Sequence, residues 1–169
     1  EADEKQVLYK ITEEACAFFE QNLKENKEAL KYLEERGISK EVVAKWRIGS
    51  VADEWRSLED YLLAKGFSKK EMLEAGLSKN KEGKTYDTFR ARIIFPISDA
   101  SGRVVAFSGR SWPAQESTAQ TSAPKYLNSP ETKIFRKSEV LYGWHFAKNA
   151  IRKLDYAVLV EGQFDLVLS

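Results

Sequence analysis

Apolar residues in the first part of the chain recur at the spacing of an amphipathic helix. Ala15, Phe18 and Leu23 fall on one face, and charged residues occupy the other faces. This pattern predicts helix over residues 5–36. Residues 22–27 interrupt the pattern and allow a division into two helices.

Shorter helices are predicted to follow. Gly37 is typical of a residue that ends a helix, and Ser39 is typical of the cap of the next helix. Helical spacing returns at residues 58–65 and 69–75. We expect these small helices to pack together through large apolar side chains, namely Trp46, Trp55, Leu62, Phe67 and Leu73.

The pattern then changes to that of β-structure. Residues 78–84 are polar and contain glycine, which predicts an exposed loop or hairpin tip. Apolar runs at residues 93–97 and 104–107 flank a turn cluster and predict a β-hairpin. Pro96 has no N–H to donate, so we expect it at a sheet edge or a bulge. Residues 111–124 are rich in Ser, Thr, Ala and Gln and are expected to form a mobile loop.

The last part of the chain predicts a helix, a strand and another helix. Residues 144–154 have helical spacing, residues 156–160 are typical of a short buried strand, and a helix begins at Gln163. This strand–helix junction opens a βα unit whose partner strands are missing. We therefore expect a fragment of a larger polypeptide with an α+β fold, in which small helices accompany a β-hairpin or mixed sheet.

Composition limits the classes of protein to consider. Hydrophobic residues make up 43% and charged residues 31%, as in soluble globular proteins with a core. The sole cysteine, Cys16, excludes a disulfide within the chain, and the single histidine excludes a Cys/His zinc site. No apolar run reaches membrane-spanning length and the first residues do not form a signal peptide, so a cytoplasmic setting without a membrane is expected.

The net charge of +1 gives no overall preference for nucleic acid, so the positions of the charges matter. Arg90 and Arg92 are two apart in a predicted strand and would share one face. Arg110 leaves the partner strand after Ser108 and Gly109. A guanidinium suits phosphate because its planar fork donates two parallel hydrogen bonds. The alternative is a hairpin with a solvated, charged face.

A second cluster gathers basic, aromatic and amide side chains around a predicted turn: Lys125, Tyr126, Asn128, Arg136 and Lys137. Positive side chains bind phosphates, aromatic rings stack on bases, and an amide bonds a base edge or a sugar hydroxyl. The alternative is an ordinary turn at residues 128–130, with Tyr126 packed and the lysines exposed.

The third cluster lies where the last predicted strand meets its helix. Glu161 would stand at the carboxyl end of a parallel strand, the usual ligand crevice of an open α/β sheet. Asp165, one helical turn on, offers a second oxygen ligand for a hard cation such as Mg²⁺. Capping of the helix by acidic groups is the alternative. We expect core packing for Cys16, a structural role for His145, and interaction with a helix dipole for Arg36.

Taken in order, these pieces resemble the RNA polymerase domain of bacterial, DnaG-type DNA primases. The resemblance covers nearly the whole chain and rests on YLEERGIS (32–39), IG (48–49), YDTFRARIIFPI (86–97), GRVVAFSGR (102–110), KYLNSPET (125–132), LYG (141–143) and VEG (160–162). Each motif is modest alone, but their ordered coincidence is specific.

The resemblance implies that residues 1–154 form the N-terminal subdomain of a primase catalytic core. Residues 155–169 would begin a truncated Toprim domain, a Rossmann-like fold that binds Mg²⁺ or Mn²⁺. The parent enzyme would synthesise RNA primers on single-stranded DNA from ribonucleoside triphosphates, and the fragment alone would be inactive. A zinc-binding domain and a domain that binds the replicative helicase would lie outside the chain.

The resemblance also implies roles for individual residues. Glu161 would be catalytic, and Glu161 and Asp165 would serve the metal. The template and the nucleotide would meet Arg36, Arg90, Arg92, Arg110, Lys125, Tyr126, Asn128 and Lys137.

Some positions depart from the family pattern. Ser108 stands where the family mostly has glycine, and Gln163 and Phe164 stand where it has Tyr-Met. Arg136 occupies a position that is often histidine in the family. Two alternatives to a bacterial primase remain. One is a different Toprim enzyme, such as a phage-type primase–helicase or a topoisomerase-like nuclease, and the other is a non-catalytic module that binds single-stranded nucleic acid.

Overall fold

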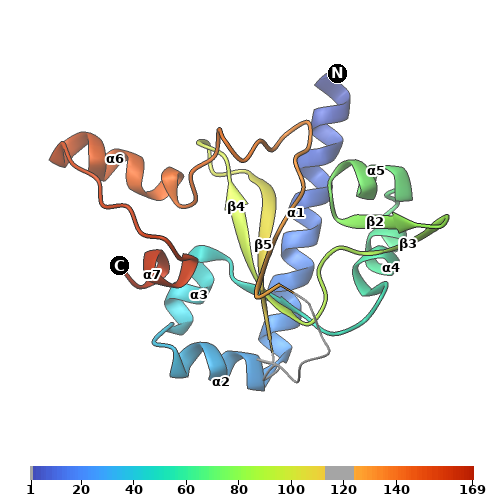
Figure 1. Cartoon of the computed structure of the whole chain (residues 1–169), viewed down its shortest axis with the longest axis horizontal. Coiled ribbons are helices and arrows are strands. Elements are labelled where there is room, and N and C mark those ends of the chain that lie inside the picture. The colour runs from blue at the N-terminus through green and yellow to red at the C-terminus, as the bar shows by residue number, and fades with distance from the viewer. Residues whose placement is uncertain (1, 113–123) are drawn as a thin grey trace.

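The computed structural model describes residues 2–112 and 124–169 (Figure 1). The helices are α1 (Ala2–Glu25), α2 (Lys27–Glu35), α3 (Lys40–Trp46), α4 (Ser57–Ala64), α5 (Lys69–Glu74), α6 (Trp144–Leu154) and α7 (Gln163–Leu168). The strands are β1 (Gly49–Val51), β2 (Ser78–Lys81), β3 (Lys84–Asp87), β4 (Arg92–Ser98), β5 (Val104–Ser111) and β6 (Tyr126–Asn128). None of these helices is long and apolar enough to cross a membrane.

A four-stranded antiparallel sheet in the order β1-β4-β5-β6 forms the centre of the fold. The long helix α1 runs along one face (Figure 1), where Ile11 and Phe19 meet Ile94 and Phe107 in one apolar cluster. On the other face, residues of α2 and α7 pack against the sheet around Phe95. Both faces of β4 and β5 are therefore buried, which confirms the α+β class expected from the sequence.

Most of the predicted helices form where expected because their caps are encoded locally. Asn26 separates α1 from α2 and its side chain accepts a hydrogen bond from the N–H of Ala29. Ser39 caps α3 in the same way. Gly37 ends α2 with φ +84°, a value that favours glycine. The division of residues 5–36 into two helices is confirmed.

The predicted hairpin of residues 93–97 and 104–107 is β4–β5. Pro96 lies beyond the end of β1, which pairs only with positions 92–94 of β4. Its missing N–H therefore costs no ladder hydrogen bond on that side, in agreement with the expected edge position. Of the predicted loop 111–124, Ser111 belongs to β5, and residues 113–123 lie outside the described residues.

The polar residues 78–84 form the hairpin tip that the sequence allowed, since β2 and β3 pair around a turn at residues 82–83. Two other expectations about the fold are wrong. Trp55 and Leu73 are not core residues, since 60% and 36% of their surfaces are exposed. Residues 156–160 form no strand: they are exposed, and no described strand lies beside them to complete a ladder. The helix predicted from Gln163 does form, as α7.

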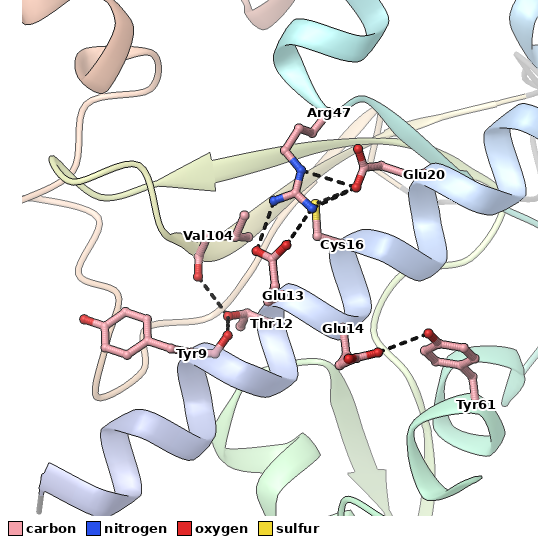
Figure 2. A network of polar contacts seen from close by, with 9 residues as sticks. All are labelled: Tyr9, Thr12, Glu13, Glu14, Cys16, Glu20, Arg47, Tyr61 and Val104. Atoms are coloured by element: carbon pink, nitrogen blue, oxygen red, sulfur yellow. Dashed lines mark hydrogen bonds and ion pairs between the residues drawn. The ribbon is translucent and has the colours of Figure 1, made fainter. Parts of the chain in front are cut away.

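A network of charged residues joins α3 to α1 (Figure 2). Arg47, at φ +54° after α3, donates from Nη2 to Glu13 Oε1 at 2.7 Å and to Glu20 Oε2 at 2.8 Å. Cys16 lies beneath this network on α1 and is fully buried, as expected for core packing, and burial raises the pKa of its thiol. Thr12 Oγ1 donates to Val104 O at 2.8 Å and so fixes α1 to β5.

Asp87 holds the start of α4, whose own N-cap position makes no side-chain cap. Its carboxylate accepts the backbone N–H of Leu58 at 2.8 Å and that of Glu59 at 3.0 Å. Burial raises the pKa of Asp87 to about 6, so the group is mainly ionised at neutral pH.

Asp87→Ala is expected to lower the free energy of unfolding by about 2 kcal/mol, because it leaves two buried N–H groups unpaired. Urea denaturation would measure the loss. Glu54→Ala, an exposed site without a hydrogen bond among the described residues, is the control and should cost less than about 0.5 kcal/mol. Equal stability of the two variants would contradict this role of Asp87.

Candidate nucleic-acid interface

The edge of the sheet formed by β5 and β6 brings part of the second predicted cluster, residues 125–128, next to Arg110. Tyr126 pairs with Arg110 and Asn128 with Ser108, and residues paired in this way point to the same face. Strand register thus joins Arg110 of the first predicted cluster to Tyr126 and Asn128 of the second. Lys125 precedes β6 and its side chain is exposed, with Nζ 5.9 Å from the Tyr126 ring centroid.

Arg110 is held between two aromatic rings. Its guanidinium carbon lies 4.6 Å from the ring centroid of Phe164 in α7 and 5.8 Å from that of Tyr126. Nη1 is also 3.4 Å from the Tyr126 hydroxyl, to which it donates. Only 8% of the residue surface is exposed, and no described carboxylate forms an ion pair with it. The arrangement leaves an oriented positive charge that a ligand can neutralise.

Arg92 does not share this face. Ile93 pairs with Arg110, so the neighbouring Arg92 points to the opposite side of the sheet, where it is 5% exposed. It donates to the carbonyl oxygens of Gly109 and Pro124 at 3.0 Å and of Lys125 at 3.4 Å. Burial lowers its pKa. These bonds show Arg92 anchoring the segment that carries Lys125.

Arg90 lies outside the strand, so the expected shared face of Arg90 and Arg92 is wrong. The chain turns at Ala91, which has φ +48°. The Arg90 guanidinium carbon lies 3.4 Å from the Trp55 ring centroid, and Nη1 lies 3.7 Å from Asp53 Oδ1. The Tyr86 ring meets the Trp55 ring edge-on at 5.7 Å. This exposed aromatic platform was missed from the sequence, although a tryptophan within the polar run 52–57 signals it.

The three remaining basic candidates, Arg36, Arg136 and Lys137, lie apart from Arg110, and Arg136 forms an ion pair with Glu139 at 3.1 Å. Arg36 is exposed at the end of α2 and lies over the ring of Tyr32, which in turn is 6.3 Å from the ring of Trp112 after β5. Lys137 is exposed, and its backbone N–H donates to Glu131 at 3.1 Å. No described contact joins any of the three to Arg110.

The third cluster is tied to the sheet by α7. Gln163 Nε2 donates to Ser108 Oγ at 2.9 Å, so two positions that depart from the family pattern bond to each other. Glu161 and Asp165 are exposed, and Asp165 Oδ2 would lie 2.7 Å from a Cβ added at Gly162. The turn before α7 is thereby brought to the same side of the sheet as Arg110.

Glu161 and Asp165 suit a hydrated Mg²⁺ ion, which uses one or two carboxylates together with substrate phosphates and water. Among residues 2–112 and 124–169, no group of three or more His, Cys, Asp or Glu side chains is placed to hold a metal ion.

Comparison with known proteins identifies the family. Residues 18–148 match the family described as the DNA primase catalytic core, N-terminal domain. A DNA primase of Clostridium acetobutylicum is 42% identical over 161 residues, covering 95% of this chain and 26% of that protein. A DNA primase of Staphylococcus aureus is 44% identical over 147 residues, covering 86% of this chain and 23% of that protein. The chain spans about a quarter of the length of these curated relatives.

Two solved structures share the fold. One is the RNA polymerase domain of Mycobacterium tuberculosis primase DnaG in complex with a double-stranded DNA oligomer with a 6-nucleotide overhang. It is 34% identical with a TM-score of 0.86, over 96% of this chain and 50% of that chain. The other, a DnaG primase catalytic domain bound to single-stranded DNA, is 35% identical with a TM-score of 0.83, over 99% of this chain and 51% of that chain. The resemblance seen in the sequence is confirmed: the chain belongs to the family of N-terminal domains of the DNA primase catalytic core.

Proposed function

We propose that this chain holds the single-stranded DNA template and the incoming ribonucleoside triphosphate in a DNA primase that synthesises RNA primers. The observation that carries the proposal is the Arg110 guanidinium, oriented between Phe164 and Tyr126 without a carboxylate partner among the described residues. A charge fixed in this way needs no reorganisation when it meets a phosphate. A related catalytic domain of the same fold is bound to single-stranded DNA.

Each residue of the interface has a chemical role in this proposal. Arg110 and Lys125 contact phosphates, and Tyr126 offers a ring on which a base stacks. Asn128 is exposed and can bond a base edge or a sugar hydroxyl. Arg92 acts through the backbone of Lys125 and is a positioning residue.

Further contacts extend along the template strand. Arg90 and Trp55 form a cationic and aromatic platform that suits an unstacked base. Arg36 and Lys137 are exposed and suit backbone phosphates at greater distance.

Residues 1–154 are proposed as the N-terminal subdomain of the catalytic core and residues 155–169 as the beginning of a Toprim domain. The exposed apolar residues Val158 and Leu159 support this division, because a buried-type sequence without a neighbouring strand calls for a sheet partner. Glu161 and Asp165 would help to hold Mg²⁺ or Mn²⁺, which when bound supplies charge stabilisation for phosphoryl transfer. Glu161 would accept or donate a proton at the edge of that site.

The first test is fluorescence anisotropy of labelled single-stranded DNA at two salt concentrations, with the 169-residue chain and its Arg110→Ala/Lys125→Ala variant. Salt-sensitive binding that the variant loses at least tenfold is the expected result, since two phosphate contacts and their released counterions are removed. Lys24→Ala/Lys27→Ala, exposed on α1 and α2, is the matched control and should bind as the unchanged chain does. Identical binding by all three proteins would refute a DNA-facing role for this interface.

A further inference from the structure

The β2–β3 hairpin presents three lysines on one face. Lys79 pairs with Tyr86 and Lys81 pairs with Lys84, so these four side chains point the same way. All three lysines are exposed. The hairpin projects from the side of the molecule opposite α6 (Figure 1). We name Lys79, Lys81 and Lys84 the lysine stripe.

The opposite face of the hairpin is buried, which fixes the direction of the stripe. Thr85 and Asp87 alternate with Lys84 and Tyr86 along β3 and are buried. Asp87 bonds the start of α4, and Thr85 Oγ1 accepts from Lys69 at 3.2 Å. The hairpin is therefore anchored through one face, and the lysine stripe is turned outward.

The charges of the stripe are not neutralised within the described chain. None of its three lysines forms an ion pair or a side-chain hydrogen bond with residues 2–112 or 124–169. Lys79 and Lys81 are two residues apart on a strand, so their Cα atoms are roughly 7 Å apart. Such a row of separated positive charges matches a linear, repeating anion better than a single small one.

The stripe adjoins the platform of Trp55 and Arg90. Tyr86, on the same face of the hairpin as the stripe, contacts Trp55 at a ring distance of 5.7 Å. The guanidinium carbon of Arg90 lies 3.4 Å from the centroid of the Trp55 ring. Basic and aromatic groups therefore follow one another from Arg90 over Trp55 and Tyr86 to the lysines of the hairpin.

We propose that the lysine stripe binds the sugar–phosphate backbone of single-stranded nucleic acid, continuing the strand path beyond Trp55. The inference rests on the proposed function and adds a binding site to it. Lysine ammonium groups act as point charges on phosphates without reading bases, while Tyr86 and Trp55 offer rings to the bases next to them. The aromatic platform favours a nucleic acid over an acidic protein, because exposed bases stack on such rings.

The test compares anisotropy of labelled, mixed-sequence single-stranded DNA of about 6 and about 20 nucleotides, the first within and the second beyond the roughly 4–16 nucleotides that one single-strand-binding surface covers. The variant is Lys79→Gln/Lys81→Gln/Lys84→Gln, which removes the three charges and keeps polar side chains. Its control, Lys24→Gln/Lys27→Gln/Lys40→Gln, removes the same charge from exposed sites on the helices. Melting curves check that both remain folded.

For the long DNA, the stripe variant should lower the slope of log affinity against log salt concentration by about 2, since each single-strand phosphate contact contributes about 0.7. The short DNA should bind all three proteins alike. If the stripe variant and its control had equal salt slopes on the long DNA, the lysine stripe would not bind DNA and the inference would be overturned. The proposed function would be unaffected by that result, because the Arg110→Ala/Lys125→Ala variant tests it separately. If the chain without substitutions showed no salt-sensitive binding to DNA, both the inference and the proposed function would be refuted.

Discussion

Lys125→Ala is expected to lower primer synthesis about 100-fold and to leave the melting temperature unchanged, because it removes a positive charge that would stabilise the reacting phosphates. The side chain is exposed and makes no ion pair among the described residues; its nearest described partner is the Tyr126 ring, 5.9 Å from Nζ. Folding therefore depends little on it. The measurement is kcat/KM for template-dependent primer synthesis by the natural full-length protein, with thermal unfolding of the same sample.

Lys27→Ala is the matched control for this prediction. Lys27 is also exposed, but it begins α2 on a part of the chain remote in sequence from the interface. We expect the control to keep wild-type activity. If Lys125→Ala lost thermal stability in proportion to activity, Lys125 would be a structural residue and its assignment to the nucleotide would be wrong.

Gly49→Ala is expected to lower the free energy of unfolding by about 3 kcal/mol or more, as overpacking against fixed backbone does. Gly49 lies in β1 where the strand meets α1. An added Cβ would lie 2.5 Å from Phe19 Cβ and 2.6 Å and 2.7 Å from the Phe19 carbonyl carbon and oxygen. Since these atoms belong to the middle of α1, the whole helix must move away from the sheet.

Urea denaturation of Gly49→Ala and Gly83→Ala would measure the free energy of unfolding of each variant. The comparison separates the cost of the steric clash at Gly49 from the cost of replacing a glycine where there is no clash. Gly83, at the tip of the β2–β3 hairpin, has open space around it but φ +80°. Gly83→Ala should lower the free energy of unfolding by about 1 kcal/mol through backbone strain alone. Equal losses in the two variants would show that α1 and β1 tolerate a wider separation than the structure has.

The helices could be predicted from the sequence because their signals are local. Asn26, Gly37 and Ser39 act within four residues of themselves, and the apolar face of α1 repeats from Leu8 to Leu23. The polar stretch around Gly83 allowed a hairpin tip, but the extent of β2 and β3 could not be predicted, since lysine and asparagine have low strand propensity and only pairing across the turn organises them.

Residues 156–160 show the opposite failure. Their apolar, β-branched sequence has strong strand propensity, yet a strand is stable only beside another strand, and none of those described lies there. Propensity without a partner predicts the wrong local structure.

The composition of the candidate site was accessible from the sequence, but its geometry was not. Arg110, Tyr126 and Asn128 fall together because strand register places them on one face. The positive φ of Ala91 removes Arg90 from the strand, and no residue pattern announces that turn. The buried position of Arg92, with three backbone carbonyls around it, is also invisible to spacing rules. The roles of these residues in binding stay predictions.

The two rings around Arg110 lower the entropy cost of binding a ligand at this side chain. A free arginine side chain loses rotational freedom when a ligand captures it, at a cost of about 1 kcal/mol. Phe164 and Tyr126 have already restricted Arg110, so the ligand is spared that entropy, whereas exposed Lys125 must still become ordered. The Arg110 side chain is thus held in one position, whereas the Lys125 side chain can adjust its position. In the proposed interface, such a pair would hold one phosphate firmly and adapt to the next one as the strand advances.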